Sequence, residues 1–328
     1  MASLSRFFSR YTGFLRSLKI VYVINNLLNR QKLQHNKELY KKYGLKRSIF
    51  GNIGSHDFKP SDLSEEIPWL DRPNALERLT QHPDFEKLPT EWQGQLRQFI
   101  QEGYMVLKGF YSPEEVDRLN KEVDGLLQND KAGFNYTGRK IMDAHLISSV
   151  VDQHYFRNQR LLRLLNFAMG RPVVPFQTIN FVQGSEQKAH SDSIHMSTEP
   201  AGYLIAAWTA LEDMHEGNGP LFYHPGSHRL PYVTCQDYAS GNTRWQLGKE
   251  SYKKYEDKIE AIVQQSAMPK KYFLGNKGDV FVWHANLLHG GSPISQEGSS
   301  RKSMVAHYFC EGVICYHEIS QRPALLKV

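Results

Sequence analysis

The spacing of apolar residues divides this chain into a helical first part and a β-rich second part. Helical spacing in "TEWQGQLRQFIQEG" predicts a helix over residues 90–103, and "YMVLKGF" predicts a strand over 104–110. In "SPEEVDRLNKEVDGLL" (112–127), Ser112 followed by Pro and, three positions after the serine, by Glu is typical of a helix start. "YFRNQRLLRLLNFAMG" predicts another amphipathic helix over 155–170, closed by its glycine.

After residue 171, short β-rich runs replace the helical spacing. Turn signals such as "EGNGP" and "NKGD" separate these runs. Strands are predicted over residues 172–182, 203–212, 220–225, 272–275, 278–284 and 303–310. Helices followed by many short strands predict an α+β chain whose second part is a β-sandwich or barrel of the jelly-roll kind.

One helical segment interrupts the series of strands. "SYKKYEDKIEAIVQQ" (251–265) places Tyr252, Tyr255 and Ile259 on one helical face, inside a long excursion at 230–270. A connection of that length on a compact β domain is typical of a lid or a binding element. We therefore expect this segment to shape a substrate site. The alternative is a helix packed on the outside of a sheet.

The distribution of charge separates the N-terminal segment from the body. The composition is globular, with 40% hydrophobic and 23% charged residues in 328. Residues 1–50 carry eleven Lys and Arg and one acid, Glu38, so residues 51–328 sum to −4 of the total +6. Because the body is not basic, a nucleic-acid-binding domain is not expected. Three cysteines without a CxxC pair favour a reducing compartment over a disulfide framework.

The basic N-terminal segment, residues 1–50, has three interpretations. Its stretch "RFFSRYTGFLRSLKIVYVINNLLNRQKL" lacks the roughly 18–20 apolar residues of a membrane span. It could be a helix packed on the body, a basic amphipathic helix on an anionic membrane, or a mitochondrial-type presequence. A loop-rich connection over 51–90 would join it to a main domain over 91–320. We expect a cytoplasmic location, with a mitochondrial or peripheral membrane location as the alternatives.

The stretch "KAHSDSIH" contains the candidate metal ligands. Two positions apart on a strand, His190 and Asp192 would point to the same side, whereas His195 would face away. Two histidines and one carboxylate form the facial triad that suits Fe(II). The second histidine must come from further along the chain. "WHANLLHGGSP" offers His284 and His289, and spacing alone does not choose between them.

Arg301 is a candidate for anchoring an anionic co-substrate. It stands twelve residues beyond His289, at the start of the last predicted strand. A planar guanidinium can bind the far carboxylate of a dicarboxylate through two hydrogen bonds. A surface cation is the alternative.

From about residue 102 to about residue 311, the chain resembles the phytanoyl-CoA dioxygenase-like family of Fe(II)/2-oxoglutarate-dependent oxygenases. The resemblance is carried, in order, by "EGYMVLKGFYSPEEVDRL", "HSDSIH", "AAWTALEDMHEGNGPLFYHPGSHR", "GDVFVWHANLLHGGSP" and "SRKS". It implies a double-stranded β-helix, the jelly-roll fold of the cupins, with N-terminal helices that buttress one sheet.

The resemblance also implies roles for individual residues. His190, Asp192 and His289 correspond to the iron ligands, and Arg301 corresponds to the arginine that binds 2-oxoglutarate. Trp208 corresponds to a tryptophan that lines the co-substrate pocket.

Two further co-substrate contacts and three further histidines follow from the same motifs. Gln177 lies near a co-substrate-contacting position. Ser191 stands where relatives often carry Gln, a difference that could remove the co-substrate contact there. The histidines that recur in such motifs without being ligands are expected to support or pack: His195, His228 and His284.

The implied activity is that of a dioxygenase that uses Fe(II), 2-oxoglutarate and O₂. It would hydroxylate an unactivated C–H bond of a small molecule, such as a lipid or acyl thioester, and release succinate and CO₂. Asp192 favours hydroxylation, or another oxygenase outcome such as desaturation, because halogenating relatives carry a small residue there. Two other functions use the same residues: a non-catalytic cupin-like protein that binds a metal or small molecule, and a metal-dependent hydrolase.

Overall fold

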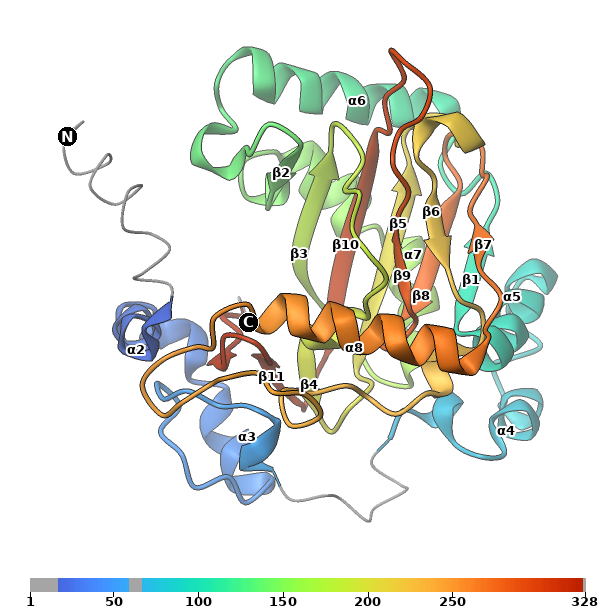
Figure 1. The fold of residues 1–328 in the computed structure, drawn as a ribbon. Helices are drawn as coiled ribbons and strands as arrows, with labels where there is room; N and C mark the ends of the chain where they lie inside the picture. The colour runs from blue at the N-terminus through green and yellow to red at the C-terminus, as the bar shows by residue number, and fades with distance from the viewer. Residues whose placement is uncertain (1–16, 59–66, 327–328) are drawn as a thin grey trace.

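The strands form one large sheet and two small ones (Figure 1). The computed structural model describes residues 17–58 and 67–326. Six antiparallel strands make up the large sheet, in the order β1–β8–β5–β10–β3–β2. Their bounds are Tyr104–Leu107 (β1), Lys140–Met142 (β2), Val173–Phe181 (β3), Leu204–Ala210 (β5), Val280–His284 (β8) and Ser303–Cys310 (β10).

The small sheets have three strands each, in the orders β12–β11–β4 and β7–β6–β9. Their bounds are Ser197–Glu199 (β4), Leu221–Tyr223 (β6), Lys271–Tyr272 (β7), His289–Gly291 (β9), Ile314–His317 (β11) and Arg322–Pro323 (β12). Successive strands alternate between sheets: β3, β5, β8 and β10 lie in the large one, and β4, β6, β9 and β11 lie in the small ones. This winding is that of a jelly roll.

The large sheet is buried on both faces. On β5, Ile205 and Ala207 belong to an apolar cluster shared with helices, whereas Ala206 and Trp208 belong to a second cluster on the other face. Strand side chains alternate between faces, so one continuous apolar run serves both clusters. The predicted strands of this kind, β3, β5, β8 and β10, are confirmed with ends shifted by up to two residues.

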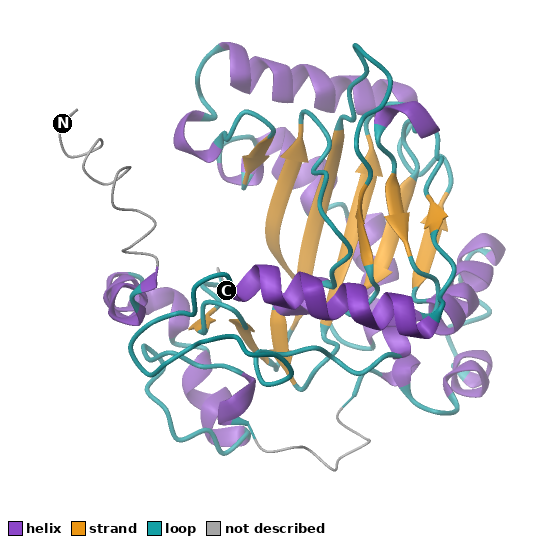
Figure 2. Cartoon of the chain, viewed as in Figure 1, coloured by secondary structure: helices purple, strands orange, loops and turns teal. Residues whose placement is uncertain are grey.

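Three helices cover one face of this sheet, which we call the helical face (Figure 2). They are α5 (Thr90–Glu102), α6 (Pro113–Gln128) and α7 (Gln159–Met169). The predicted start of α6 is confirmed, because Ser112 Oγ accepts from the N–H of Glu115 at 3.3 Å and the Glu115 carboxylate accepts from the N–H of Ser112 at 2.8 Å.

Some element ends differ from the predictions. The helix expected from residue 155 begins at Gln159, because a π-helix over Val151–Phe156 precedes it and Asn158 caps its first turn through Leu161 N–H at 3.1 Å. Strands β2, β4, β9, β11 and β12 have two to four residues, too few to show a period of two. Short 3₁₀ helices lie at Arg30–Leu33, Ser55–Asp57, Trp69–Asp71, Gly133–Asn135, Ala144–Leu146, Asp192–Ile194, Glu216–Asn218 and Ser227–Arg229.

The described part of the N-terminal segment packs on the body. It forms α2 (Lys19–Leu28) and α3 (Asn36–Lys42), and the buried Leu33 and Tyr40 join a cluster with Ile314 of β11. Residues 1–16 lie outside the described residues, as do 59–66 in the expected loop-rich connection. That connection also contains a helix, α4 (Ala75–Gln81). Within the described residues, no helix is long and apolar enough to cross a membrane.

The helix expected at 251–265 is confirmed as α8 (Ser251–Ser266), which crosses in front of the strands in Figure 1. Its buried Tyr255 and Ile259 pack in one cluster with Ile194 and Leu288. Ile194 follows candidate ligand Asp192 by two residues and Leu288 precedes His289, so α8 packs against the segments that carry these ligands.

Candidate metal centre and co-substrate pocket

Three candidate ligands converge on one point in the interior. Ligand atoms of His190, Asp192 and His289 lie within 4.8 Å of one another, and all three residues are buried. Nε2 of His289 is 3.7 Å from Oδ1 of Asp192. Two bonds of about 2.0–2.2 Å to a shared ion span that separation. The donor set therefore fits a metal ion held between the three side chains.

The segment that carries His190 and Asp192 does not form a continuous strand. His190 forms an isolated bridge with His289, in which each N–H donates to the other residue's carbonyl oxygen at 2.9 Å. Asp192 begins the 3₁₀ helix Asp192–Ile194. A turn and a cross-bridge, rather than the alternation of a continuous strand, thus bring the ligands together.

Backbone carbonyls orient both histidine rings. Nδ1 of His190 donates to the carbonyl oxygen of Lys188 at 2.8 Å, and Nδ1 of His289 donates to that of Leu287 at 2.9 Å. Donation from Nδ1 leaves the Nε2 lone pair free for a metal. Burial lowers the pKa of His289 to about 4, so its ring is neutral at neutral pH, as metal binding requires.

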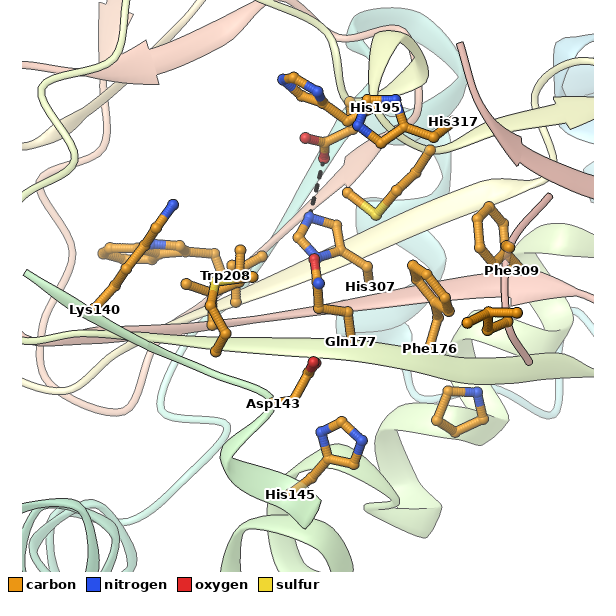
Figure 3. A pocket seen from close by; sticks show the side chains of 18 of the residues that line it. Lys140, Asp143, His145, Phe176, Gln177, His195, Trp208, His307, Phe309 and His317 are labelled. Atoms are coloured by element: carbon orange, nitrogen blue, oxygen red, sulfur yellow. Dashed lines mark ion pairs between the residues drawn. The ribbon is translucent and has the colours of Figure 1, made fainter. Parts of the chain in front are cut away.

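Two residues of the large sheet hold the Asp192 carboxylate. The indole Nε1 of Trp283, on β8, donates to Oδ2 at 2.7 Å. Nε2 of His307, on β10, lies 3.4 Å from the same oxygen (Figure 3). Because Oδ2 is occupied in this way, Oδ1 is the oxygen that faces His289.

Gly290 allows β9 to lie close to the chain before His190. A Cβ at this position would lie 2.5 Å from the carbonyl oxygen of Gln187 and 2.5 Å from the Phe222 ring. A side chain there would push His289 away from His190, so the sequence needs glycine after the ligand.

Arg301 is a buried cation with an unsatisfied donor. Its side chain is 1% exposed, and its Nη2 donates to Ser185 Oγ at 3.3 Å. Its Nε has no hydrogen-bond acceptor among the described residues. Burial lowers its pKa to about 10, so the guanidinium stays charged at neutral pH. Such a group is stabilised when an anion binds it.

One cavity of about 620 Å³ connects the candidate ligands to Arg301. Trp208 and Gln177, expected in the co-substrate pocket, both line it, and so does Lys140. Lys140 lies opposite Phe181 in the β2–β3 register, and the Arg301 guanidinium lies 5.6 Å from the centre of the Phe181 ring. Two cations thus belong to the same region of the cavity.

The cavity has two unlike ends. Figure 3 shows Lys140 and Trp208 at one end and Phe176 and Phe309 at the other. The two phenylalanine rings are 4.7 Å apart, centre to centre. The volume lies within the roughly 300–1,000 Å³ of small-molecule sites, so a co-substrate and the reacting part of a second molecule fit together.

Ser191 does not line this cavity. Its N–H donates to the hydroxyl of Tyr255 at 2.9 Å, and its Oγ lies 2.7 Å from that of Ser193. It joins the ligand segment to α8.

Of the other histidines in the motifs, His284 and His228 lie apart from the triad and His195 lies beside it. Nε2 of His284 lies 3.0 Å from a carboxylate oxygen of Asp71, so His289 rather than His284 meets the other ligands. Nε2 of His228 lies 3.3 Å from the Ile100 carbonyl oxygen. His195 lines the cavity and packs against His317 and Tyr252.

Three residues of the site were not predicted from the sequence: Trp283, His307 and Lys140. Alternation along the predicted strands 278–284 and 303–310 places Trp283 and His307 on the inward face, so this signal could have found them. Lys140 lies on β2, whose three residues carry no recognisable pattern.

Comparison with known proteins agrees with this geometry. The family model described as "Phytanoyl-CoA dioxygenase (PhyH)" matches residues 99–303. The ectoine dioxygenase of Nocardia farcinica is 28% identical over 235 residues, which cover 64% of this chain and 77% of that one. The peroxisomal phytanoyl-CoA dioxygenase of Rattus norvegicus is 23% identical over 237 residues, which cover 65% and 67%.

The fold is also found among solved structures. The crystal structure of EctD from S. alaskensis with bound Fe superimposes with a TM-score of 0.52 at 24% identity, covering 66% of this chain and 76% of that one. The chain thus has the cupin-like jelly-roll fold, the double-stranded β-helix predicted from the sequence. It is a non-haem Fe(II)/2-oxoglutarate-dependent dioxygenase that uses O₂ and acts on a small molecule. It belongs to the phytanoyl-CoA dioxygenase family.

Proposed function

We propose that His190, Asp192 and His289 bind the iron and that the enzyme hydroxylates an unactivated C–H bond of a lipid-like, anionic small molecule. The observation that carries this proposal is the buried convergence of three ligands in the same cavity as a buried arginine with an unsatisfied donor. Three ligands on one side leave the other side of the ion open to a co-substrate and O₂.

Arg301 is the proposed anchor for the far carboxylate of 2-oxoglutarate. The Nε–H without an acceptor supplies one of the two parallel hydrogen bonds that a guanidinium makes to a carboxylate. Trp208 and Gln177 would bound the co-substrate, and Lys140 would add a second positive charge at that end. Ser191 makes its hydrogen bonds to Tyr255 and Ser193, so we do not propose it as a co-substrate contact.

The chain's own contribution is to orient, bind and exclude water. Trp283 and His307 fix the Asp192 carboxylate, and the backbone fixes both histidine rings. Buried apolar walls keep the reacting centre dry. Iron, 2-oxoglutarate and O₂ together supply the oxidising power that inserts one oxygen atom into a C–H bond, with succinate and CO₂ as by-products.

The substrate class follows from the end of the cavity away from Trp208. Phe176 and Phe309 give that end an apolar wall, and Lys32, Arg157 and Arg322 also line the cavity. An apolar body with an anionic group, as in an acyl thioester of a phosphorylated carrier, matches both features. The relatives named above act on ectoine and on phytanoyl-CoA. We infer a cytoplasmic location, supported by three free, buried cysteines.

Segment 230–270 is proposed to set substrate choice through Tyr252, which lines the cavity beside His195. Tyr252→Ala should lower substrate oxidation while substrate-independent conversion of 2-oxoglutarate to succinate continues. Lys258→Ala, on the exposed side of α8, is the matched control and should change neither rate. Equal loss of both rates in Tyr252→Ala, together with a lower melting temperature, would show that the segment stabilises the fold and does not select the substrate.

The experiment that tests the function loads the protein anaerobically with Fe(II) and 2-oxoglutarate, admits O₂, and screens metabolite extracts. A product heavier by one oxygen atom, formed with one equivalent of succinate, is expected. Product formation without O₂ or 2-oxoglutarate would identify a hydrolase. Metal binding with no succinate under any condition would identify a binding protein.

A further inference from the structure

Helix α2 is amphipathic, but its apolar side faces outward and its polar side faces the protein. Its large aliphatic residues are exposed, namely Ile20 (55%), Ile24 (52%), Leu27 (50%) and Leu28 (80%). At 3.6 residues per turn these four fall within an arc of roughly 100°. They form one outward ridge, which we call the α2 ridge.

The side of α2 that faces the protein is polar instead. Lys19 is 7% exposed and its Nζ donates to Gln321 Oε1. Asn26 is 1% exposed and its Nδ2 donates to the Phe50 carbonyl oxygen at 3.0 Å. A surface helix ordinarily buries its apolar stripe against the core. Here polar contacts fix the helix and leave the apolar stripe unused within the described residues, which marks an interaction site.

An exposed tryptophan lies beside the start of α2. The N–H of Lys19 donates to the carbonyl oxygen of Trp245 at 2.9 Å, so Trp245 lies beside the first turn of α2. Its side chain is 69% exposed, and the Arg244 guanidinium lies 5.1 Å from the centre of its ring. Tryptophan is enriched at the boundary between water and lipid headgroups.

The net charge of the N-terminal segment that contains the ridge selects the partner. Residues 1–50 contain eleven cations and one acid. Two copies of such a segment repel each other, which disfavours a second copy of this chain, whereas an anionic lipid surface attracts it. We propose that the α2 ridge and Trp245 dock this enzyme on an anionic lipid bilayer, with the helix lying in the interface.

Docking in this way has a consequence for the active site, which rests on the proposed function. The inward side of α2 contributes Asn25 and Asn26 to the wall of the cavity, and the next turn contributes Lys32. A docked α2 therefore places the substrate end of the cavity next to the lipid. An amphipathic substrate held in the bilayer can enter there with its anionic group near Lys32.

The test measures sedimentation of the full chain with vesicles of phosphatidylcholine alone and of phosphatidylcholine mixed with phosphatidylglycerol. Binding to the mixed vesicles is expected, weakening as salt is raised. The variant I24Q/L28Q should bind about tenfold less or weaker still, because it removes two exposed aliphatic side chains from the contact. The matched control L76Q/L274Q changes two exposed leucines elsewhere, at 40% and 49% exposure, and should bind like the wild type.

Two measurements distinguish a bilayer from the other candidate occupants of the ridge, which are residues 1–16 and a second copy of the chain. They are the melting temperature and the mass from size-exclusion chromatography. The proposal expects I24Q/L28Q to keep both values, because Ile24 and Leu28 are 52% and 80% exposed in the part of the chain that the structure describes. A lower melting temperature with unchanged vesicle binding would show that residues 1–16 cover the ridge, and a wild-type dimer dissociated by the variant would show a second copy. Either result overturns the proposal, as does absence of wild-type binding. Iron binding and succinate formation, measured without vesicles, report on the proposed function separately.

Discussion

The two faces of the large sheet come from the same strands but differ in what their side chains contact. On the helical face, Ile205 and Ala306 pack against apolar residues of α5, α6 and α7. On the cavity face, the neighbouring positions include Trp208, Trp283 and His307, which line the cavity or hold Asp192. Burial is nearly complete on both faces.

The difference teaches that burial alone does not distinguish structural from functional positions in this fold. The helical face gains its stability from area removed from water, so its residues are replaceable by others of the same volume. The cavity face contains polar atoms whose partners include groups that must bind from outside the chain. Substitutions on the two faces should therefore separate stability from iron and co-substrate binding.

The largest effect on iron binding and turnover is expected from substitutions of the proposed metal ligands. His190→Ala and His289→Ala should each abolish iron binding and turnover, because the two remaining ligands hold Fe(II) weakly. The measurement is iron content after gel filtration, with succinate formation beside it. His195→Ala should keep its iron. Equal loss of iron in that variant would contradict the assignment of ligands.

On the helical face, Ile205→Ala should lower the free energy of unfolding by about 2–5 kcal/mol, the usual effect of emptying a buried aliphatic site. Ile205 is fully buried and lies three residues from Trp208 on the same strand. Denaturant unfolding measures the loss. The folded variant should bind iron and 2-oxoglutarate like the wild type; a weakened co-substrate affinity would mean that the two faces are coupled.

Arg301→Ala should retain iron while the requirement for 2-oxoglutarate rises by about 10- to 150-fold, the range of a lost charge-assisted hydrogen bond of about 1.5–3 kcal/mol. Arg301→Lys should rescue only part of this loss, because an ammonium cannot form the parallel pair of bonds. The concentration of 2-oxoglutarate at half-maximal succinate formation is the readout. An unchanged value would assign the anchoring to another cation, such as Lys140.

The smallest effect on the cavity face is expected from Trp283→Phe, which removes the hydrogen bond to Asp192 Oδ2 but keeps an aromatic ring. Loss of a partner that orients a metal ligand lowers metal affinity by about 10- to 100-fold. Phe281→Leu, on the same strand and face, controls for packing and should keep the iron affinity. Iron titration of both variants decides whether the bond or the ring volume matters.

The sequence alone determined the elements with long regular patterns. The helices near 90–103 and 112–127, the helix at 251–265 and the buried strands around Trp208 and His307 follow from periods that local sterics impose. The family motifs gave His190, Asp192, His289 and Arg301, because their order and spacing reflect positions on those elements. The roles of these residues stay predictions until the variants are measured.

Only the tertiary structure decided what depends on contacts between distant segments. The backbone bridge between His190 and His289, and the bond from His284 to Asp71, determine which histidine meets Asp192. The same holds for α2 and α8. Both show apolar spacing in the sequence, yet α8 buries its apolar face and α2 exposes it, because Lys19 and Asn26 find polar partners on the body. A periodic pattern fixes which residues share a face, and only the packed neighbours fix where that face points.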